Sequence, residues 1–155
     1  MTAEPVTTAD GTFLLPERLS PAPEPSGLDQ PYHEAVRESR LVVQRCRSCD
    51  SWQWGPEWVC YSCQSFDLAW DEVPTTDGAY RGTIYSWERV WHPIEPLLVD
   101  AVPYVAVLVS LPSAGDIRML GNLVGDPLDA VEIGTPVEAV FEHHDDYTLV
   151  QWKRE

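Results

Sequence analysis

The amino-acid sequence predicts a mainly β protein in which a short helix and a small metal-binding ribbon precede a five-stranded barrel. The ribbon is predicted from two Cys-x-x-Cys motifs, Cys46 to Cys49 and Cys60 to Cys63, which contain all four cysteines of the chain. The barrel is predicted from five segments after Gly78 in which apolar residues recur between Gly- and Pro-rich turns. At 155 residues the chain is long enough for one ordinary domain or two very small ones.

These patterns divide the chain into four parts. We expect a disordered or extended arm at residues 1–27, a helix at 28–40, the ribbon at 41–74 and the barrel domain at 75–155. The arm contains five prolines among small and polar residues and has no periodic apolar face. It is either a plain tail or a strap that wraps a partner subunit, with Phe13, Leu14 and Leu15 as its apolar anchor.

The helix is predicted from its first residues and its spacing. Asp29 is a fair N-cap residue and Pro31 suits the first turn. Tyr32, Ala35 and Val36 then recur at helical spacing. The helix should lead into a strand that enters the first Cys motif.

The two Cys motifs predict a metal site. Each Cys-x-x-Cys hook turns two thiolates inward, so two hooks supply the four ligands of one tetrahedral ion. Four thiolates leave no open position for a metal-bound water, and we therefore expect a structural Zn²⁺ ion. Iron in a rubredoxin-like site, disulfides and a thioredoxin-type redox pair are the alternatives. The expected ligands are Cys46, Cys49, Cys60 and Cys63.

The ribbon strands are predicted from alternation on either side of the second hook. Between the hooks, tryptophans and a proline alternate with small or polar residues from Trp52 to Trp58, as in a hairpin. Apolar residues alternate again from Phe66 to Trp70, which predicts a third short strand. A unit of this size has too small a core to fold alone, so the metal would replace the missing burial.

The barrel strands follow in an order typical of an OB fold. Five strands, the first long enough to bend across two sheets, are separated by turn signals. Between the third and fourth strands, residues 126–131 predict one helical turn capped by Asp126. The predicted strands are Tyr80 to Trp91, Tyr104 to Leu111, Ile117 to Val124, Val137 to His143 and Tyr147 to Trp152.

The first barrel strand carries candidate contact residues. Its odd positions include Tyr85, Trp87, Arg89 and Trp91, and strict alternation would place them on one face. Aromatic rings beside arginines suit a flat group next to an anion, or an aromatic-rich protein contact. The alternative is a barrel core with two exposed arginines. A cluster of arginines around the first hook is either a solvated face or a second anion-binding group. Its members are Arg37, Arg40, Arg45 and Arg47.

The net charge, the N-terminal residues and the length of the apolar runs limit the function and the location of the protein. The formal net charge is −15, which repels phosphate backbones and anionic lipid surfaces. The N-terminus lacks a basic region followed by an apolar one, and the apolar run at 104–111 is too short to cross a bilayer. We expect a cytoplasmic protein, because reduced thiols there can bind a metal.

Motifs of independent catalysis are not found. The sequence has no Gly-x-Ser-x-Gly, no Gly-x-Gly-x-x-Gly and no Walker loop, and every cysteine is assigned to the ribbon. His92 is expected in a loop, and His143 and His144 are expected at the end of a hairpin, exposed to solvent. We therefore predict no catalytic residue in this chain.

The ordered combination of motifs resembles the OB-fold, zinc-ribbon proteins associated with acyl-CoA, a family formerly described as a domain of unknown function. The likeness covers about residues 30–152. The chain departs from the family at Asp50 and Tyr61, where many relatives have Gly and Pro. The motifs that carry the resemblance are the two Cys hooks, Gly82 to Ser86, Val102 to Val107, Leu120 to Leu123, and Ile133 to Val137 with Phe141.

The resemblance implies an accessory subunit of a thiolase-superfamily enzyme or of a hot-dog-fold enoyl-CoA hydratase. Such a subunit lies over the CoA entrance of its partner, which supplies the catalytic residues; the partner can be an aldolase or thiolase that degrades steroid or lipid side chains. The alternative function is single-strand nucleic-acid binding, which OB folds and zinc ribbons also perform. Candidate CoA or partner contacts are Arg47, Tyr85, Trp87, Arg89, Trp91 and Tyr104.

Overall fold

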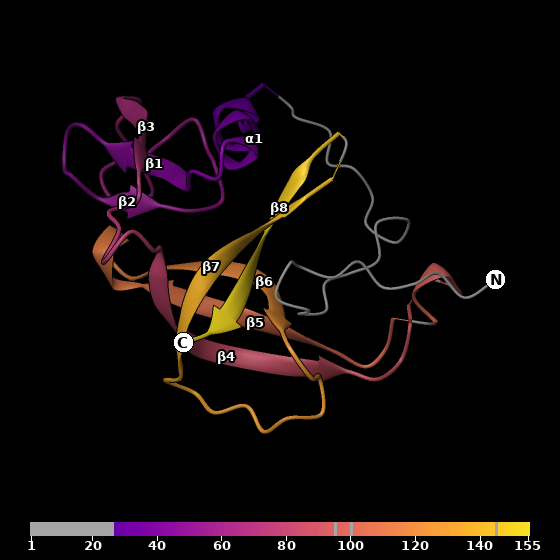
Figure 1. Ribbon diagram of the computed structural model, residues 1–155. Coiled ribbons are helices and arrows are strands. Elements are labelled where there is room, and N and C mark those ends of the chain that lie inside the picture. Colours follow the sequence, from indigo (N-terminus) through magenta and orange to yellow (C-terminus); the bar gives the residue numbers. More distant parts are fainter. Residues whose placement is uncertain (1–26, 95, 100, 145) are drawn as a thin grey trace.

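The structure is a computed structural model that describes residues 27–94, 96–99, 101–144 and 146–155. The predicted arm lies outside these residues, except for Gly27. A helix, a three-stranded sheet and a closed five-stranded barrel follow one another along the chain (Figure 1). The predicted fold class, mainly β with a zinc ribbon and an OB barrel, is confirmed.

The helix α1 (Gln30–Arg37) begins after Asp29, which occupies the N-cap position as predicted. The Asp29 side chain makes no capping hydrogen bond. Its carboxylate lies 3.4 Å from His33 Nε2 instead, one helical turn further on. Ala35 and Val36 are buried, so the helix packs through the face that its spacing predicts.

The ribbon is a sheet of three antiparallel strands in the order β2-β1-β3. Its strands are β1 (Val42–Cys46), β2 (Trp52–Gln53) and β3 (Leu68–Glu72). The predicted hairpin between the hooks is correct for two residues of β2, and residues 54–59 are bends and coil. The physical reason is that the Gln44 side chain binds the backbone N–H and C=O of Glu57, each at 3.0 Å, so this segment bonds to a side chain and not to a strand.

The barrel closes in the strand order β4-β5-β6-β8-β7. All neighbouring pairs are antiparallel except β6 and β8, which are parallel. Two short 3₁₀ helices, η2 (Pro96–Leu98) and η3 (Pro112–Ala114), lie on either side of β5. The barrel strands are β4 (Arg81–Val90), β5 (Tyr104–Leu111), β6 (Ile117–Val124), β7 (Pro136–His143) and β8 (Thr148–Arg154).

The helical turn predicted at residues 126–131 forms only over its first four residues, where the backbone N–H of Asp129 donates to the Asp126 carbonyl at 3.2 Å. Its capping by Asp126 is as predicted. Asp126 Oδ1 accepts a hydrogen bond from the backbone N–H of Leu128 at 2.8 Å. The carbonyl groups of Pro127 and Asp129, which a continuing helix would use, accept hydrogen bonds from Arg89 instead. A side chain from β4 therefore takes the place of helical bonding.

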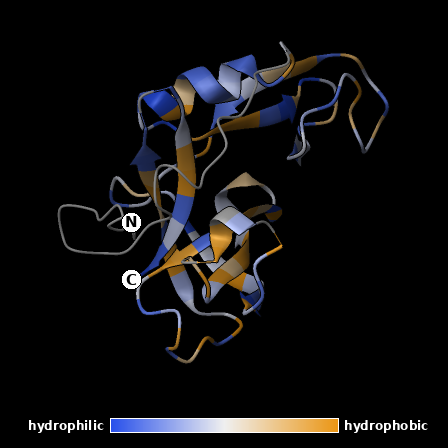
Figure 2. Ribbon diagram, turned by 90° about the vertical axis from the view of Figure 1, so that its right-hand side faces the viewer, coloured by the Kyte–Doolittle hydropathy of each residue, from blue (hydrophilic) through white to orange (hydrophobic). Residues whose placement is uncertain are grey.

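Ribbon and barrel share one hydrophobic core. Leu41, Val43 and Val73 from the ribbon region belong to the same buried cluster as the barrel residues. A second contact joins Gly115, in the β5–β6 connection, to Trp52 of β2: a Cβ on Gly115 would lie 3.3 Å from the indole. Figure 2 shows apolar residues, in orange, in the barrel strands, whereas α1 is mostly polar. The ribbon and the barrel thus pack as one body.

No helix in these described ranges has both the length and the apolar character needed to cross a membrane.

Candidate metal centre and contact surface

The four cysteines meet at one point of the ribbon. Their sulfur atoms all lie within 4.8 Å of one another, and the Sγ–Sγ distance is 3.6 Å for Cys46 and Cys63 and 3.7 Å for Cys49 and Cys60. A regular tetrahedron of thiolates at a Zn–S distance of about 2.3 Å has edges of about 3.8 Å. A disulfide would need about 2.05 Å. The arrangement therefore fits one tetrahedral ion and contains no disulfide.

The two hooks have the same backbone geometry. In the first, the N–H of Asp50 donates to the Cys46 carbonyl at 2.9 Å; in the second, the N–H of Gln64 donates to the Cys60 carbonyl at 3.0 Å. Asp50 and Gln64 both have φ of 62°, the left-handed region that favours glycine. Asp is one of the residues that tolerate this conformation, which explains how the first hook forms without a glycine at this position.

The thiols differ in their proton affinity. Hydrogen bonds from the Ser51 hydroxyl and backbone lower the pKa of Cys49 to about 6. The backbone of Ser65 lowers the pKa of Cys63, but the neighbouring sulfurs and desolvation together raise it to about 12. Thiolates so close together repel one another, and a divalent cation between them allows all four to be deprotonated.

Two buried glutamines that the sequence analysis missed hold the second hook in place. Gln53 Nε2 donates to Gln44 Oε1 at 2.9 Å, and Gln53 Oε1 accepts from the backbone N–H of Tyr61 at 3.0 Å. Both side chains are at most 3% exposed. The available signal was a glutamine inside the apolar strand run 41–45, since a buried amide needs partners.

The predicted common face of the first barrel strand is wrong, because β4 contains a β-bulge. The register with β5 shifts between Ile84 and Ser86, so Tyr85 is the extra residue. Before the bulge the even positions face the core, and after it Trp87 packs against the core. Tyr85 is 46% exposed on the outside of the barrel. The bulge therefore separates Tyr85 from the other candidate contacts on this strand.

Arg89 and its two tryptophan neighbours form a second group. The guanidinium lies 5.5 Å from the ring centroid of Trp87 and 5.9 Å from that of Trp91. Arg89 Nε and a terminal nitrogen donate to the carbonyls of Pro127 and Asp129 at 2.6 and 2.7 Å. This arginine thus joins β4 to the β6–β7 connection, with two of its nitrogens bonded within the chain.

The arginine cluster around the first hook is largely paired with acidic residues. Arg47 forms two hydrogen bonds with the Asp71 carboxylate, and Arg45 lies 3.2 Å from Asp50. Arg40 pairs with Glu38 at 2.7 Å. The interpretation of this cluster as a charge-balanced surface is supported, and Arg47 lies on the ribbon, apart from the barrel contacts.

Tyr104 lines a groove beside the barrel. The groove has a volume of about 380 Å³ and lies between α1 and strands β5, β6 and β8. Its apolar walls include Tyr32 and Leu120, and the side-chain amide of Gln151 accepts the backbone N–H of Asn122 at 2.7 Å. The six candidate contacts thus lie in several places, and their role in binding CoA or a partner stays a prediction.

The histidines do not all lie where the sequence predicts. His92 is exposed in a bend, as expected. His143 is exposed, with Nε2 at 3.0 Å from Ser39 Oγ and Nδ1 at 3.0 Å from Thr148 Oγ1. The prediction for His144 is wrong: its side chain is 2% exposed, lies 3.0 Å from Glu142 Oε1, and stacks on Tyr147. The buried Glu142, two residues earlier, and the Tyr147 ring across the turn hold this side chain inside.

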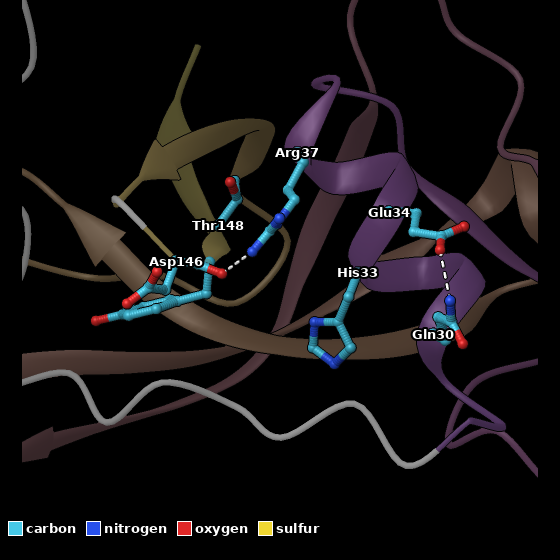
Figure 3. A pocket seen from close by; sticks show the side chains of 7 residues that line it. Gln30, His33, Glu34, Arg37, Asp146 and Thr148 are labelled. Carbon is cyan, nitrogen blue, oxygen red and sulfur yellow. Dashed lines mark hydrogen bonds between the residues drawn. The ribbon is translucent and has the colours of Figure 1, made fainter.

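A second cavity, of about 320 Å³, lies between α1 and the β7–β8 hairpin (Figure 3). His33 and Arg37 reach it from the helix, and Thr148 from β8. Arg37 donates to the backbone carbonyl of Asp146, and Gln30 donates to Glu34 at 2.6 Å. These contacts join the helix to the hairpin.

Comparisons with known proteins agree with this architecture. The rubredoxin-like zinc ribbon domain of ChsH2 matches residues 33–69, and the C-terminal OB-fold domain of ChsH2 matches residues 77–142. The probable enoyl-CoA hydratase alpha subunit of Thermomonospora curvata is 38% identical over 126 residues, which cover 81% of this chain. The chain spans 37% of the length of that relative.

Two solved structures are similar to the fold. A chain of the Ltp2-ChsH2(DUF35) aldolase is 31% identical, with a TM-score of 0.71, and the match covers 86% of this chain and 98% of that chain. A DUF35 protein of unknown function from Sulfolobus solfataricus is 14% identical, with a TM-score of 0.57 over 84% of this chain and 87% of that chain. The second likeness concerns the fold alone.

Geometry and comparison together identify the metal centre. The sulfur quartet has the dimensions of a tetrahedral thiolate site, and the segment that contains it matches a zinc ribbon. The centre is therefore a structural zinc site, as predicted, and its ligand set would leave no position for substrate.

Proposed function

This chain belongs to the ChsH2 family, and we propose that it is a non-catalytic accessory subunit that binds and stabilises a thiolase-like acyl-CoA enzyme and shapes its CoA entrance. The observation that carries the proposal is the match to a chain of the Ltp2-ChsH2(DUF35) aldolase, because it covers 98% of that chain. A likeness over the whole of one subunit supports the same kind of role. The partner would be an aldolase or a thiolase that acts on steroid or lipid side chains.

Engagement of the reactive side chains supports a non-catalytic role. The four thiols converge on one metal centre. His143 bonds to Ser39 and Thr148, and the buried His144 bonds to Glu142. A general base needs a reacting group within hydrogen-bond reach, whereas His143 bonds to β8 and to the α1–β1 connection, and His144 bonds to β7.

The shared core of ribbon and barrel supports a shaping role. A subunit that positions the entrance of another active site must present a fixed surface, because loosely held contacts lose affinity when they order. Zinc holds the hooks, and Leu41, Val43 and Val73 join the ribbon to the barrel core.

Co-expression with the proposed thiolase-like partner subunit tests the proposal. We expect a complex that co-purifies, and we expect the partner alone to be less soluble or less active in cleaving its β-hydroxyacyl-CoA. The control is the same partner co-expressed with the Cys49→Ser variant, whose metal centre is incomplete. A partner that is fully soluble and active on its own would contradict the proposal.

A hydratase partner is the second candidate. The relative from Thermomonospora curvata is named a probable enoyl-CoA hydratase alpha subunit, and this chain matches 37% of its length. Co-expression with a hot-dog-fold hydratase, followed by an assay of water addition to an enoyl-CoA, separates the two candidates. Complex formation with the hydratase and not with the thiolase-like subunit would favour it.

Single-strand nucleic-acid binding is less well supported. The aromatic side chains that it needs are present, but Arg47 and Arg89 make hydrogen bonds within the chain and the formal net charge is −15. Salt-dependent binding of an oligonucleotide would revive this alternative.

A further inference from the structure

We propose that the outer face of strands β4, β5 and β6 is the surface that docks onto the thiolase-like subunit, and that the subunit places a carboxylate against Arg118. The proposal rests on the proposed function, because it takes that subunit as the occupant. We refer to this surface as the outer sheet face. Its residues are Tyr85, Tyr104, Ala106, Leu108, Arg118 and Leu120.

Strand register places apolar side chains side by side on the outer sheet face. Leu108 of β5 pairs with Leu120 of β6, and their inward neighbours Val107, Val109 and Met119 are buried. Because successive side chains alternate between faces, Leu108 and Leu120 point away from the core. Leu120 is 69% exposed. A leucine in this position gains from burial against a partner.

The bulge in β4 adds an aromatic ring to the same face. Tyr85 is the extra residue of the bulge and is 46% exposed. The guanidinium of Arg118 lies 3.6 Å from its ring centroid. This stacking uses the flat side of the guanidinium and leaves its N–H donors free at the edge. Tyr and Arg are enriched among the residues that dominate binding at interfaces.

Arg118 is the unpaired cation of the described chain. Among the arginines that the structure describes, each of the others has a carboxylate or a backbone carbonyl within reach, and Arg118 has the Tyr85 ring alone. This occurs in a protein of formal net charge −15, where carboxylates are abundant. Such a guanidinium complements a carboxylate presented by a partner.

The outer sheet face continues into the groove beside α1. Leu120, Ala106 and Tyr104 line both surfaces, and Tyr32 of the helix forms the opposite wall of the groove. A partner segment seated on the sheet could therefore extend a side chain into the 380 Å³ groove. Other exposed apolar side chains, such as Trp58 in the ribbon and Ile133 in the β6–β7 connection, have no unpaired arginine beside them in the described residues.

The test compares matched variants in complex formation with the thiolase-like subunit. Leu120→Asp should raise the dissociation constant at least tenfold, since it buries a charge at the centre of the contact. Leu128→Asp is the control, because Leu128 is 61% exposed in the β6–β7 connection, away from this face. Arg118→Glu should weaken the complex at least tenfold and Arg118→Lys less, and added salt should reduce the affinity of the wild type more than that of Arg118→Glu.

The affinities of these variants decide whether the outer sheet face is the docking surface. Unchanged affinity of Leu120→Asp and Arg118→Glu in a complex that the wild type forms would overturn this inference and leave the proposed function intact. Failure of the wild type to form any complex would overturn both. If Leu120→Asp lowers the melting temperature of the isolated chain, or changes its oligomeric state in solution, this face is covered by the chain itself or by a second copy, and the inference is wrong.

Discussion

Replacement of Gln53 by leucine should unfold the ribbon more easily, although the new side chain is apolar and similar in size. Gln53 is 2% exposed and joins β2 to β1 through Gln44 and to the second Cys hook through Tyr61. The variant loses the bonds to Gln44 and Tyr61, at about 1 kcal/mol each, and a longer one of 3.4 Å to the Val59 carbonyl. It also leaves the backbone N–H of Tyr61 without its partner, at about 1–3 kcal/mol. The added apolar burial offsets part of this loss, and we expect a net loss of about 2 kcal/mol.

A second variant at the same position sharpens the test. The orientation of Gln44 is fixed, because its amide nitrogen donates to the Glu57 carbonyl and its oxygen accepts from the Glu57 N–H. Gln53→Glu would therefore place a carboxylate against the Gln44 oxygen in a buried site, and it should destabilise more than Gln53→Leu at pH 7.

The assay is urea unfolding at a fixed, buffered concentration of free zinc, because metal binding and folding are coupled. The control is Gln64→Leu, an exposed position in the second hook. Its φ of 62° affects Gln and Leu alike, because both carry a Cβ, and the change should alter stability by less than about 0.5 kcal/mol. Equal stability of Gln53→Leu and Gln64→Leu would refute the reasoning, since the buried amide would then contribute nothing.

Three further predictions follow from the metal centre and the barrel. Cys49→Ser should abolish stoichiometric zinc and cause aggregation, because it breaks a closed shell coupled to folding; a soluble variant with unchanged metal content would contradict a structural site. Gly121→Ala should destabilise by about 1–3 kcal/mol, since its Cβ would lie 2.7 Å from the buried Trp152 indole, and an unchanged melting temperature would argue against that packing. Burial raises the pKa of Glu142, while Gln151 and His144 lower it in part, so the folded state binds this proton more tightly than the unfolded state. The wild type should therefore lose stability relative to Glu142→Gln as pH rises from about 4 through the raised pKa, and a difference that stays constant from pH 4 to 7.5 would contradict this.

Local patterns were sufficient for the helix, the barrel strands and the metal centre. Hook spacing is a local property, because the four thiolates converge once each Cys-x-x-Cys turn forms. The residue at positive φ after each hook belongs to the same turn. Strands β5 and β6 match their predicted ends at both termini, since turns and apolar alternation lie within a few residues of each other. The bulge at Tyr85 has no such signal, because an extra residue in one strand is defined by the partner strand.

Residue spacing alone therefore shows that two Cys hooks bind one ion, and that five strands with a shared alternation form a barrel. The tertiary structure decided which charges are free. Arg47 meets Asp71 across 24 positions of the chain and Arg89 meets Pro127 across 38, which leaves Arg118 to stack on Tyr85. A side chain's partner depends on which distant segment packs beside it, and the energy of that packing is spread over a core that no local pattern records.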